Sequence, residues 1–203
     1  RDKGISILDV RTSTFTAVVD VNGESIFDLI FDSKQNLWVA TEKSGLRVKL
    51  AGQNHFQTFT TSTDISIPSN KIQTIFEDQQ QVFWVATEDA GVFQFDIQTG
   101  VSKSFTYQED DNTSLCSNYV RDIYQDSKGL LWFATDKGLC QFERNSESFI
   151  RHNRNNARVN SLIDDRVMSL YQDTGGVMWV GTFSGISRWN AELTPFTHLS
   201  KTF

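Results

Sequence analysis

Short apolar runs alternate with polar turns along the whole chain. One example is YVRDIYQ at 119–125, followed by the polar turn DSKGL and then by LWFAT at 131–135. β-Branched and aromatic residues dominate these runs, and apolar residues do not recur at the three- and four-residue spacing of an amphipathic helix. The pattern therefore predicts an all-β protein made of short strands.

The same pattern occurs four times. A tryptophan follows each turn, at gaps of 46, 48 and 47 residues, with an aspartate six residues before it and a threonine three residues after it. A glycine lies three or four residues beyond each threonine. The tryptophans are Trp38, Trp84, Trp132 and Trp179; the aspartates are Asp32, Asp78, Asp126 and Asp173; the threonines are Thr41, Thr87, Thr135 and Thr182; the glycines are Gly45, Gly91, Gly138 and Gly185.

The beginning of the chain matches the second half of this unit. RDKGISILDVRTSTF at 1–15 aligns with TDKGLCQFERNSESF at 135–149. Three units have a phenylalanine eleven residues after the glycine, and the second has Phe105 fourteen residues after Gly91, which predicts a three-residue insertion there. The chain thus contains four units and half of a fifth, and internal repeats of this length are typical of stacked architectures.

Each unit is predicted to be a four-stranded sheet. The first two strands are apolar on both faces, so each sheet needs a neighbour on both sides. Four-stranded sheets of this length, packed face to face, form a β-propeller. We expect each aspartate to cap its turn, each tryptophan to pack between blades, and the small residue two positions later to let sheets approach. The expected boundaries are a half blade at 1–21 and blades at about 24–62, 70–108, 118–155 and 165–203.

Composition narrows the classes of function. The 203 residues carry a net charge of -6, which argues against a nucleic-acid backbone as partner. No apolar run approaches the roughly 18 residues of a membrane helix. Cys116 and Cys140 are interpreted as free, part-buried thiols, with a disulfide as the alternative. With three scattered histidines they form no metal-ligand pattern, so no metal or cofactor is expected.

The repeat resembles a known family, the two-component regulator propeller. Its phrase D-x-x-G-x-L-W-x-[AG]-T-x-x-G-[LI] is matched by one unit at Asp126, Gly129, Leu131, Trp132, Ala134, Thr135, Gly138 and Leu139. The next unit matches nearly as well, while Gln35 and Gln81 stand where the first two units would have the turn glycine.

This resemblance implies a periplasmic sensor region of an inner-membrane receptor. Such repeats build propellers of about seven blades whose output domain is a histidine kinase or a diguanylate cyclase. We therefore expect a non-catalytic extracytoplasmic segment of a larger, membrane-anchored chain that binds a small molecule and regulates that output. The alternatives are a protein-interaction scaffold and, ranked last, a carbohydrate-active enzyme, which would need two carboxylates flanking one bond. Exposed blade edges also suggest self-association.

Candidate ligand residues follow from the propeller geometry. Loops before strand one and between strands two and three gather on one face around the channel, which is the default position for a pocket. The candidates are Glu42, Glu88, Asp136 and Phe183 after the threonines, Asp28 and Asp122 within strand one, and Asn70, Asn118 and Asp165 in the lead-in loops. Rings of acids suit a cation or a saccharide, four arginines suit an anion, and turn capping is the structural alternative.

Overall fold

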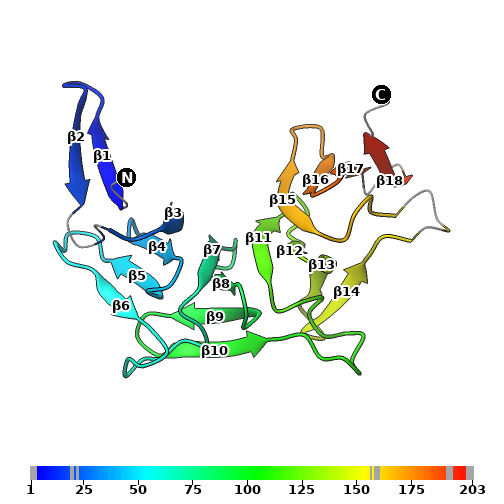
Figure 1. Ribbon diagram of the computed structural model, residues 1–203, viewed down its shortest axis with the longest axis horizontal. Helices are drawn as coiled ribbons and strands as arrows, with labels where there is room; N and C mark the ends of the chain where they lie inside the picture. The colour runs from blue at the N-terminus through cyan, green and yellow to red at the C-terminus, as the bar shows by residue number, and fades with distance from the viewer. Residues whose placement is uncertain are drawn as a thin grey trace.

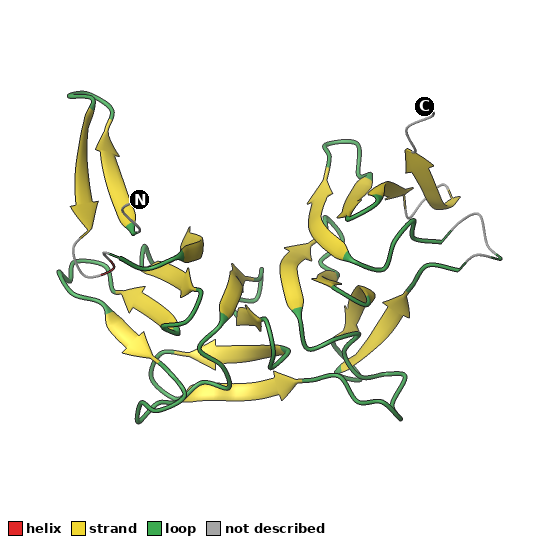
Figure 2. Ribbon diagram, viewed as in Figure 1, coloured by secondary structure: helices red, strands yellow, loops and turns green. Residues whose placement is uncertain are grey.

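The computed structural model describes residues 4–18, 21, 23–155, 157, 161–190 and 194–199, with residue 190 and the last segment described by their backbone alone. Eighteen strands form one two-stranded and four four-stranded antiparallel sheets, each in sequence order (Figures 1 and 2). The hairpin comprises β1 (Ile5–Asp9) and β2 (Thr14–Val18). Blade 1 comprises β3 (Ile26–Phe31), β4 (Leu37–Thr41), β5 (Leu46–Lys49) and β6 (Gln57–Phe59). Blade 2 comprises β7 (Ile72–Glu77), β8 (Phe83–Thr87), β9 (Val92–Asp96) and β10 (Gly100–Phe105). Blade 3 comprises β11 (Val120–Gln125), β12 (Leu131–Thr135), β13 (Gly138–Glu143) and β14 (Ser148–His152). Blade 4 comprises β15 (Val167–Gln172), β16 (Met178–Thr182), β17 (Gly185–Asn190) and β18 (Thr194–Leu199).

The four blades form an open arc. The first strands β3, β7, β11 and β15 line its concave side, while β6, β10 and β14 lie on the convex side (Figure 1). The β1–β2 hairpin stands beyond blade 1 at one end of the arc. The prediction of an all-β propeller with four blades and a half blade is confirmed.

The six-residue gap between aspartate and tryptophan has a direct cause. In blade 3, Oδ1 of Asp126 accepts the backbone N–H groups of Lys128 and Leu130, and its Oδ2 accepts the indole N–H of Trp132 at 2.9 Å. The other three blades repeat the indole bond at 2.8–2.9 Å. One carboxylate therefore closes the turn and also accepts the N–H of the indole. The sequence predicted the first of these roles but not the second.

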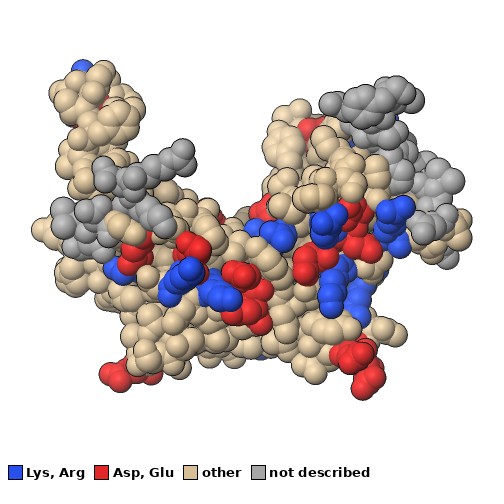
Figure 3. Space-filling model, in the orientation of Figure 1, with Lys and Arg blue, Asp and Glu red and all other residues tan. Residues whose placement is uncertain are grey.

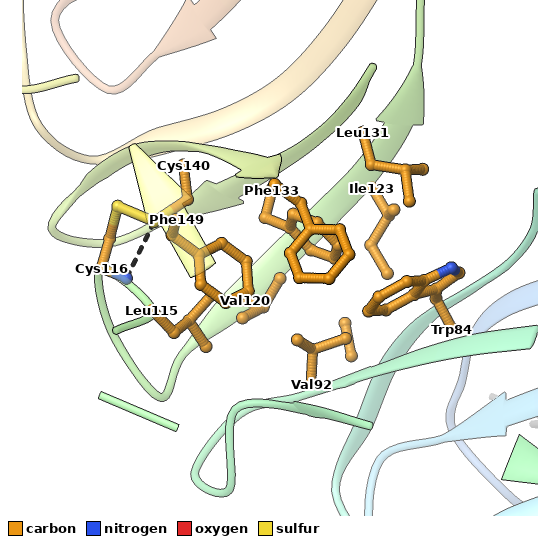
Figure 4. Packing of buried hydrophobic residues seen from close by; sticks show 12 residues of the cluster. Trp84, Val92, Leu115, Cys116, Val120, Ile123, Leu131, Phe133, Cys140 and Phe149 are labelled. Carbon is orange, nitrogen blue, oxygen red and sulfur yellow. Dashed lines mark hydrogen bonds between the residues drawn. A yellow bond between two sulfur atoms is a disulfide. The ribbon is translucent and has the colours of Figure 1, made fainter. Parts of the chain in front are cut away.

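The tryptophans of blades 1, 2 and 3 pack against the following blade. Trp38 stacks on Phe83 with ring centroids 4.3 Å apart, and Trp132 contacts Trp189 at 5.0 Å. Trp84 meets Phe133 at 5.4 Å inside the cluster between blades 2 and 3 (Figure 4). The apolar core of this protein thus lies between blades, so no blade has a core of its own.

The turns join neighbouring blades by a recurrent bond, here called the turn joint. The last residue of strand one accepts the backbone N–H of the turn in the preceding blade. The pairs are Glu77 with Ser33 at 2.7 Å, Gln125 with Gln79 at 2.8 Å, and Gln172 with Ser127 at 2.7 Å. In blade 1 the equivalent residue is Phe31, which has no such acceptor and is exposed.

The predicted three-residue insertion before Phe105 is wrong. The strand register pairs Val101 with Phe95, just as Phe149 pairs with Phe142, whereas Phe105 pairs with Val92 at the far end of β10. The fourth-strand phenylalanines are therefore not equivalent, because Val101 holds the place of Phe149 and Phe105 lies four residues further along the strand, with a one-residue β-bulge between them.

The interpretation of the cysteines as free thiols is also wrong. Cys116 and Cys140 form a disulfide with Cα atoms 6.0 Å apart, and both are buried (Figure 4). The backbone N–H of Cys116 also donates to Sγ of Cys140 at 2.9 Å. At the same place in blade 4, Ile163 N–H donates to Oγ of Ser187 at 3.1 Å. Strand three thus holds the lead-in loop in both blades, and in blade 3 the link is covalent.

Candidate functional site

Four backbone bonds bring the predicted residues after each threonine to one end of the blades. The N–H groups of Glu42, Glu88, Asp136 and Phe183 donate to the carbonyls of the residues just before strand one, at 3.0, 3.1, 3.4 and 3.0 Å. Those carbonyls belong to Ser25, Lys71, Tyr119 and Arg166. Each blade therefore presents one pair of side chains here, and we call this end the ring face.

The threonine and glycine of the repeat shape the ring face. The threonine hydroxyl donates to the carbonyl of the following glycine in all four blades, at 2.7–2.8 Å. At Gly45, where φ is +81°, a Cβ atom would lie 2.1 Å from the carbonyl oxygen of Phe59. The tight turn after strand two therefore requires glycine at this position.

The candidates in the lead-in loops have structural bonds. Oδ1 of Asn70 accepts the N–H of Thr61 at 2.9 Å, and its carbonyl accepts the N–H of Gly45 in the preceding blade at 2.9 Å. Asn118 makes the same two bonds with Tyr107 and Gly91. Asp165 repeats them with Arg154 at 2.6 Å and Gly138 at 2.7 Å. These three side chains hold the blade-to-blade connections.

The two strand-one acids also join blades. Oδ2 of Asp28 accepts the Thr74 hydroxyl at 2.6 Å and the N–H of Ile75 at 3.0 Å. Oδ2 of Asp122 accepts the N–H of Leu170 at 2.7 Å. Burial raises the pKa of Asp122, the negative charge of Asp28 adds to this, and the N–H groups that donate to its carboxylate partly oppose it. These contacts link blade 1 to blade 2 and blade 3 to blade 4.

The pair of side chains that each blade presents at the ring face differs in chemistry from blade to blade. In blade 2, Lys71 lies 3.7 Å from Glu88 and 3.3 Å from Asp89. Hydrogen bonding to Asp89, followed by the charges of Glu88 and Asp89, raises the pKa of Lys71. In blade 4 the guanidinium of Arg166 lies 3.9 Å from the centroid of the exposed Phe183 ring. The same backbone frame therefore carries an ion pair in one blade and a cation–π pair in another.

Blade 3 holds polar atoms without partners. The guanidinium of Arg121 lies 3.9 Å from the centroid of the Tyr119 ring and donates to its hydroxyl at 3.0 Å. Nε of Arg121 and Oδ1 of Asp136 are buried and make no hydrogen bond within the described residues. Such atoms call for an explanation, because burying a polar group without a partner costs stability.

Sequence analysis missed a feature of strand one. In every blade one residue is bulged out of the pairing register between strands one and two. The bulged residues are Phe27, Gln73, Arg121 and Met168. Bulges re-aim side chains and are common next to binding sites. These residues recur at the spacing of the repeat, but the sequence does not show that they are bulged. The pairing register between strands one and two identifies the bulges.

Charges of both signs are mixed on the surface. Figure 3 shows Lys and Arg side chains interleaved with Asp and Glu in a belt across one face of the arc. Arg47 is engaged in an ion pair with Glu24. Within the parts of the chain that the structure describes, no group of three His, Cys, Asp or Glu is placed to hold a metal ion. In the same residues, no helix is long and apolar enough to cross a membrane.

Solved structures share this fold. The extracellular domain of the putative hybrid two component system BT4673 from B. thetaiotaomicron matches with a TM-score of 0.68 and 20% identity, over 87% of this chain and 24% of that one. PorZ, a surface component of the type-IX secretion system of Porphyromonas gingivalis, matches with a TM-score of 0.69 and 17% identity, over 91% and 29%. Virginiamycin B lyase from Staphylococcus aureus matches with a TM-score of 0.70 and 10% identity, over 98% and 63%. At these identities the likeness shows the propeller fold alone, and this chain spans only part of each of these structures.

The sequence identifies a family more specifically than the fold does. No curated protein matches the chain. The family described as two component regulator propeller matches residues 66–89, 114–137 and 161–184. Each matched segment runs from the lead-in loop through strands one and two to the ring face, and so includes the turn-closing aspartate and the buried tryptophan. Three segments of this chain therefore match the repeat of the two component regulator propeller family.

Proposed function

We propose that this chain is part of an extracytoplasmic sensor module that binds a small molecule at the ring face and regulates a membrane-coupled output domain. A histidine kinase or a diguanylate cyclase is the output that the repeat family implies. The observation that carries the proposal is the ring of paired positions, which keeps one backbone frame while its side chains vary. A constant frame with variable side chains is what a recognition surface on a repeat scaffold requires.

The proposed contact point is blade 3. Oδ1 of Asp136 and Nε of Arg121 are an acceptor and a donor that the protein leaves unused. Both atoms are buried, so in this proposal the ligand displaces the side chains that cover them; a saccharide, whose hydroxyls both donate and accept, is then a suitable candidate, while Arg121 also suits an anion. The segment acts without catalysis in this proposal, because signalling needs only a ligand that prefers one of two arrangements.

Location outside the cytoplasm has two supports. The buried Cys116–Cys140 disulfide is of a kind that forms and persists in oxidising compartments. The solved domain of BT4673 is described as extracellular. The periplasm is the compartment that an inner-membrane receptor would offer.

Thermal-shift titrations of the chain test the sensor proposal. Maltose, myo-inositol and inorganic phosphate serve as separate probes, and a ligand that binds the folded state raises the melting temperature. Asp136→Asn should remove that rise, while Glu109→Gln, at an exposed loop acid, should leave it intact. A rise that survives both Asp136→Asn and Arg121→Gln contradicts the proposed site, and consumption of the probe would favour an enzyme.

A protein-interaction scaffold is the second candidate. Large apolar side chains are exposed at the blade 1 end of the arc, at Phe15, Phe27, Leu29 and Phe31. Patches of this kind mark interaction surfaces, including self-association through blade edges. Sedimentation velocity of wild type and Phe31→Ser distinguishes the cases, since a scaffold or self-associating edge predicts an oligomer that the substitution weakens.

A further inference from the structure

The boundary between blades 2 and 3 is closed by an arginine at the end opposite the ring face. Arg144 follows β13 and reaches back to blade 2, where Nη2 donates to Oδ2 of Asp78 at 2.7 Å and Nη1 donates to Oε1 of Gln80 at 2.9 Å. Asp78 is the aspartate that closes the blade 2 turn and holds Trp84. The guanidinium therefore fills the space between the two blades.

The boundary between blades 1 and 2 lacks this arginine. Ile97 follows Phe95 by two residues, as Arg144 follows Phe142, and Phe95 and Phe142 hold the same place in their sheets. A cavity of about 440 Å³ lies at this boundary, within the range typical of small-molecule sites. Of these two boundaries, one is thus filled at this place and the other is open.

At the boundary between blades 1 and 2, the turn aspartate does not need a bond from a cationic side chain. Asp32, the equivalent of Asp78, already accepts four hydrogen bonds, including one from Nδ2 of Asn36 at 2.8 Å. Asn36 therefore supplies the bond that Arg144 supplies at the other boundary. The hydrogen-bonding capacity of Asp32 is met from within blade 1, so the carboxylate needs no further donor from a side chain of blade 2.

The remaining walls combine an apolar base with unused polar groups. Leu50, Phe83 and Ile97 contribute half-buried apolar surface. In the residues that the structure describes, the side-chain amides of Gln57 and Gln98 make no hydrogen bond, although both line the cavity. Each amide offers two donors and one acceptor to a ligand.

Charged groups of both signs line this cavity. They are Lys34 and Asp32 from blade 1 and Asp96 from blade 2. The backbone N–H of Thr99 is the main cause that lowers the pKa of Asp96, and the positive charge of Lys34 contributes to the shift. One lysine and two carboxylates that already accept hydrogen bonds, together with two amides and an apolar base, suit a neutral molecule whose hydroxyl groups both donate and accept.

We propose that the cavity between blades 1 and 2 binds a neutral polyol or sugar ring, with its C–H face on Phe83 and Ile97 and its hydroxyls on Gln57 and Gln98. This site lies at the opposite end of the strands from the ring face, because its residues lie in the turns that follow strands one and three or in the strand ends next to them. It is independent of the sensor proposal, and Asp136→Asn is expected to leave it unchanged.

Two-dimensional ¹H–¹⁵N NMR of the labelled chain tests this site. Maltose and myo-inositol are titrated as neutral probes, with free arginine and inorganic phosphate as charged ones. We expect a neutral probe to shift the Trp38 indole N–H and the side-chain amides of Gln57 and Gln98. Ile97→Arg should fill the cavity as Arg144 does and weaken that binding at least about tenfold.

Matched variants make the outcome decisive. Arg144→Ile opens the other boundary and should not change binding at Gln57 and Gln98. Gln98→Leu provides a second loss variant in case Ile97→Arg perturbs folding. Overturning results would be the absence of shifts with both neutral probes, stronger shifts with arginine or phosphate, or an affinity unchanged in both Ile97→Arg and Gln98→Leu.

Discussion

Two hairpins of this protein have the same pattern and opposite environments. In the β13–β14 hairpin Phe142 and Phe149 are each 4% exposed, whereas the equivalent Leu8 and Phe15 in the β1–β2 hairpin are 46% and 72% exposed. Both hairpins share a left-handed residue in the turn, Glu147 with φ of 53° in one and Ser13 with φ of 55° in the other. Their local conformation is therefore alike, and the difference lies in their neighbours.

The neighbours account for the burial. Strand β13 pairs with β12 on its other edge, and Trp84 of blade 2 packs 5.1 Å from Phe142. Among the described residues, β1 pairs with β2 alone. The apolar side chains of such a hairpin are thus buried by the neighbouring strand and the neighbouring blade. This is expected for a repeat protein, in which stability is a sum of units and nearest-neighbour interfaces.

Truncation of the paired phenylalanines should give the largest contrast. Phe149→Ala should lower the free energy of unfolding by about 3–5 kcal/mol, since it empties a packed position. Phe15→Ala, at the same place in the exposed hairpin, should change it by no more than about 0.5 kcal/mol. Urea unfolding followed by tryptophan fluorescence measures both, and equal losses would show that the β1–β2 hairpin is packed in solution.

The disulfide should give the next largest effect, because only the buried hairpin is tied covalently to its loop. Replacing Cys116 by Val together with Cys140 by Ala should lower the free energy of unfolding by about 3 kcal/mol, as expected for a loop closed across a separation of 24 residues. Ser187→Ala, at the same place in blade 4, removes the hydrogen bond from the Ile163 N–H and should lower it by about 1 kcal/mol. Equal losses in the two variants would mean that the covalent link adds nothing.

Arg144 provides a third contrast, because the equivalent residue of the exposed hairpin is Val10, which is 80% exposed. Arg144→Val should lower the free energy of unfolding at neutral pH by about 1–3 kcal/mol, since Asp78 stays buried without its partner. Burial alone would raise the pKa of Asp78, but hydrogen bonds from Arg144 and Trp84 outweigh it, and the net shift is downward.

The sign of this shift sets the pH dependence. A depressed carboxyl pKa contributes stability that is present above the ordinary value of about 3.9 and is lost as the pH falls through the folded-state pKa. The difference between wild type and Arg144→Val should therefore shrink as the pH is lowered below about 4. Urea melts across that range test it, and a constant difference would exclude the ion pair as the cause.

The turns should give the smallest effect. Glu147→Gly relieves a left-handed residue at the loss of an exposed ion pair with Lys103, so a net gain of about 0.5 kcal/mol is expected. Ser13→Gly makes the same change in the exposed hairpin and should not alter the main unfolding transition. A gain from Ser13→Gly as large as that from Glu147→Gly would place the β1–β2 hairpin inside the cooperative unit.

The repeat made most of the fold predictable. Trp38, Trp84, Trp132 and Trp179 indicated the blades and their packing, because burial between sheets requires the same residue at the same place each time. The disulfide was not predictable, since Cys116 and Cys140 occupy positions that have no counterpart cysteines in the other units. Their proximity depends on how the lead-in loop crosses β13, which spacing alone does not specify.

The sequence predicted the positions of the candidate residues better than it predicted the hydrogen bonds of their side chains. The residues after each threonine do gather on one face, because a backbone bond repeats in every blade. Asn70, Asn118 and Asp165 instead hold the loops, and this use of their side chains depends on backbone N–H groups nine to eleven residues earlier. Arg144 reaches an aspartate 66 residues away, a contact that no local pattern indicates.

The turn joint has a consequence for how such chains grow. Glu77, Gln125 and Gln172 each accept a main-chain N–H, so this bond does not depend on the side chain of the preceding turn, although the Ser33 hydroxyl adds a second bond to Glu77. A unit copied by gene duplication and inserted between any two of these blades would find a compatible connector on both sides. Blade number can thus change in a single genetic event, and a unit that begins like blade 1, with Phe31 at the connector, would lack this bond to the blade before it.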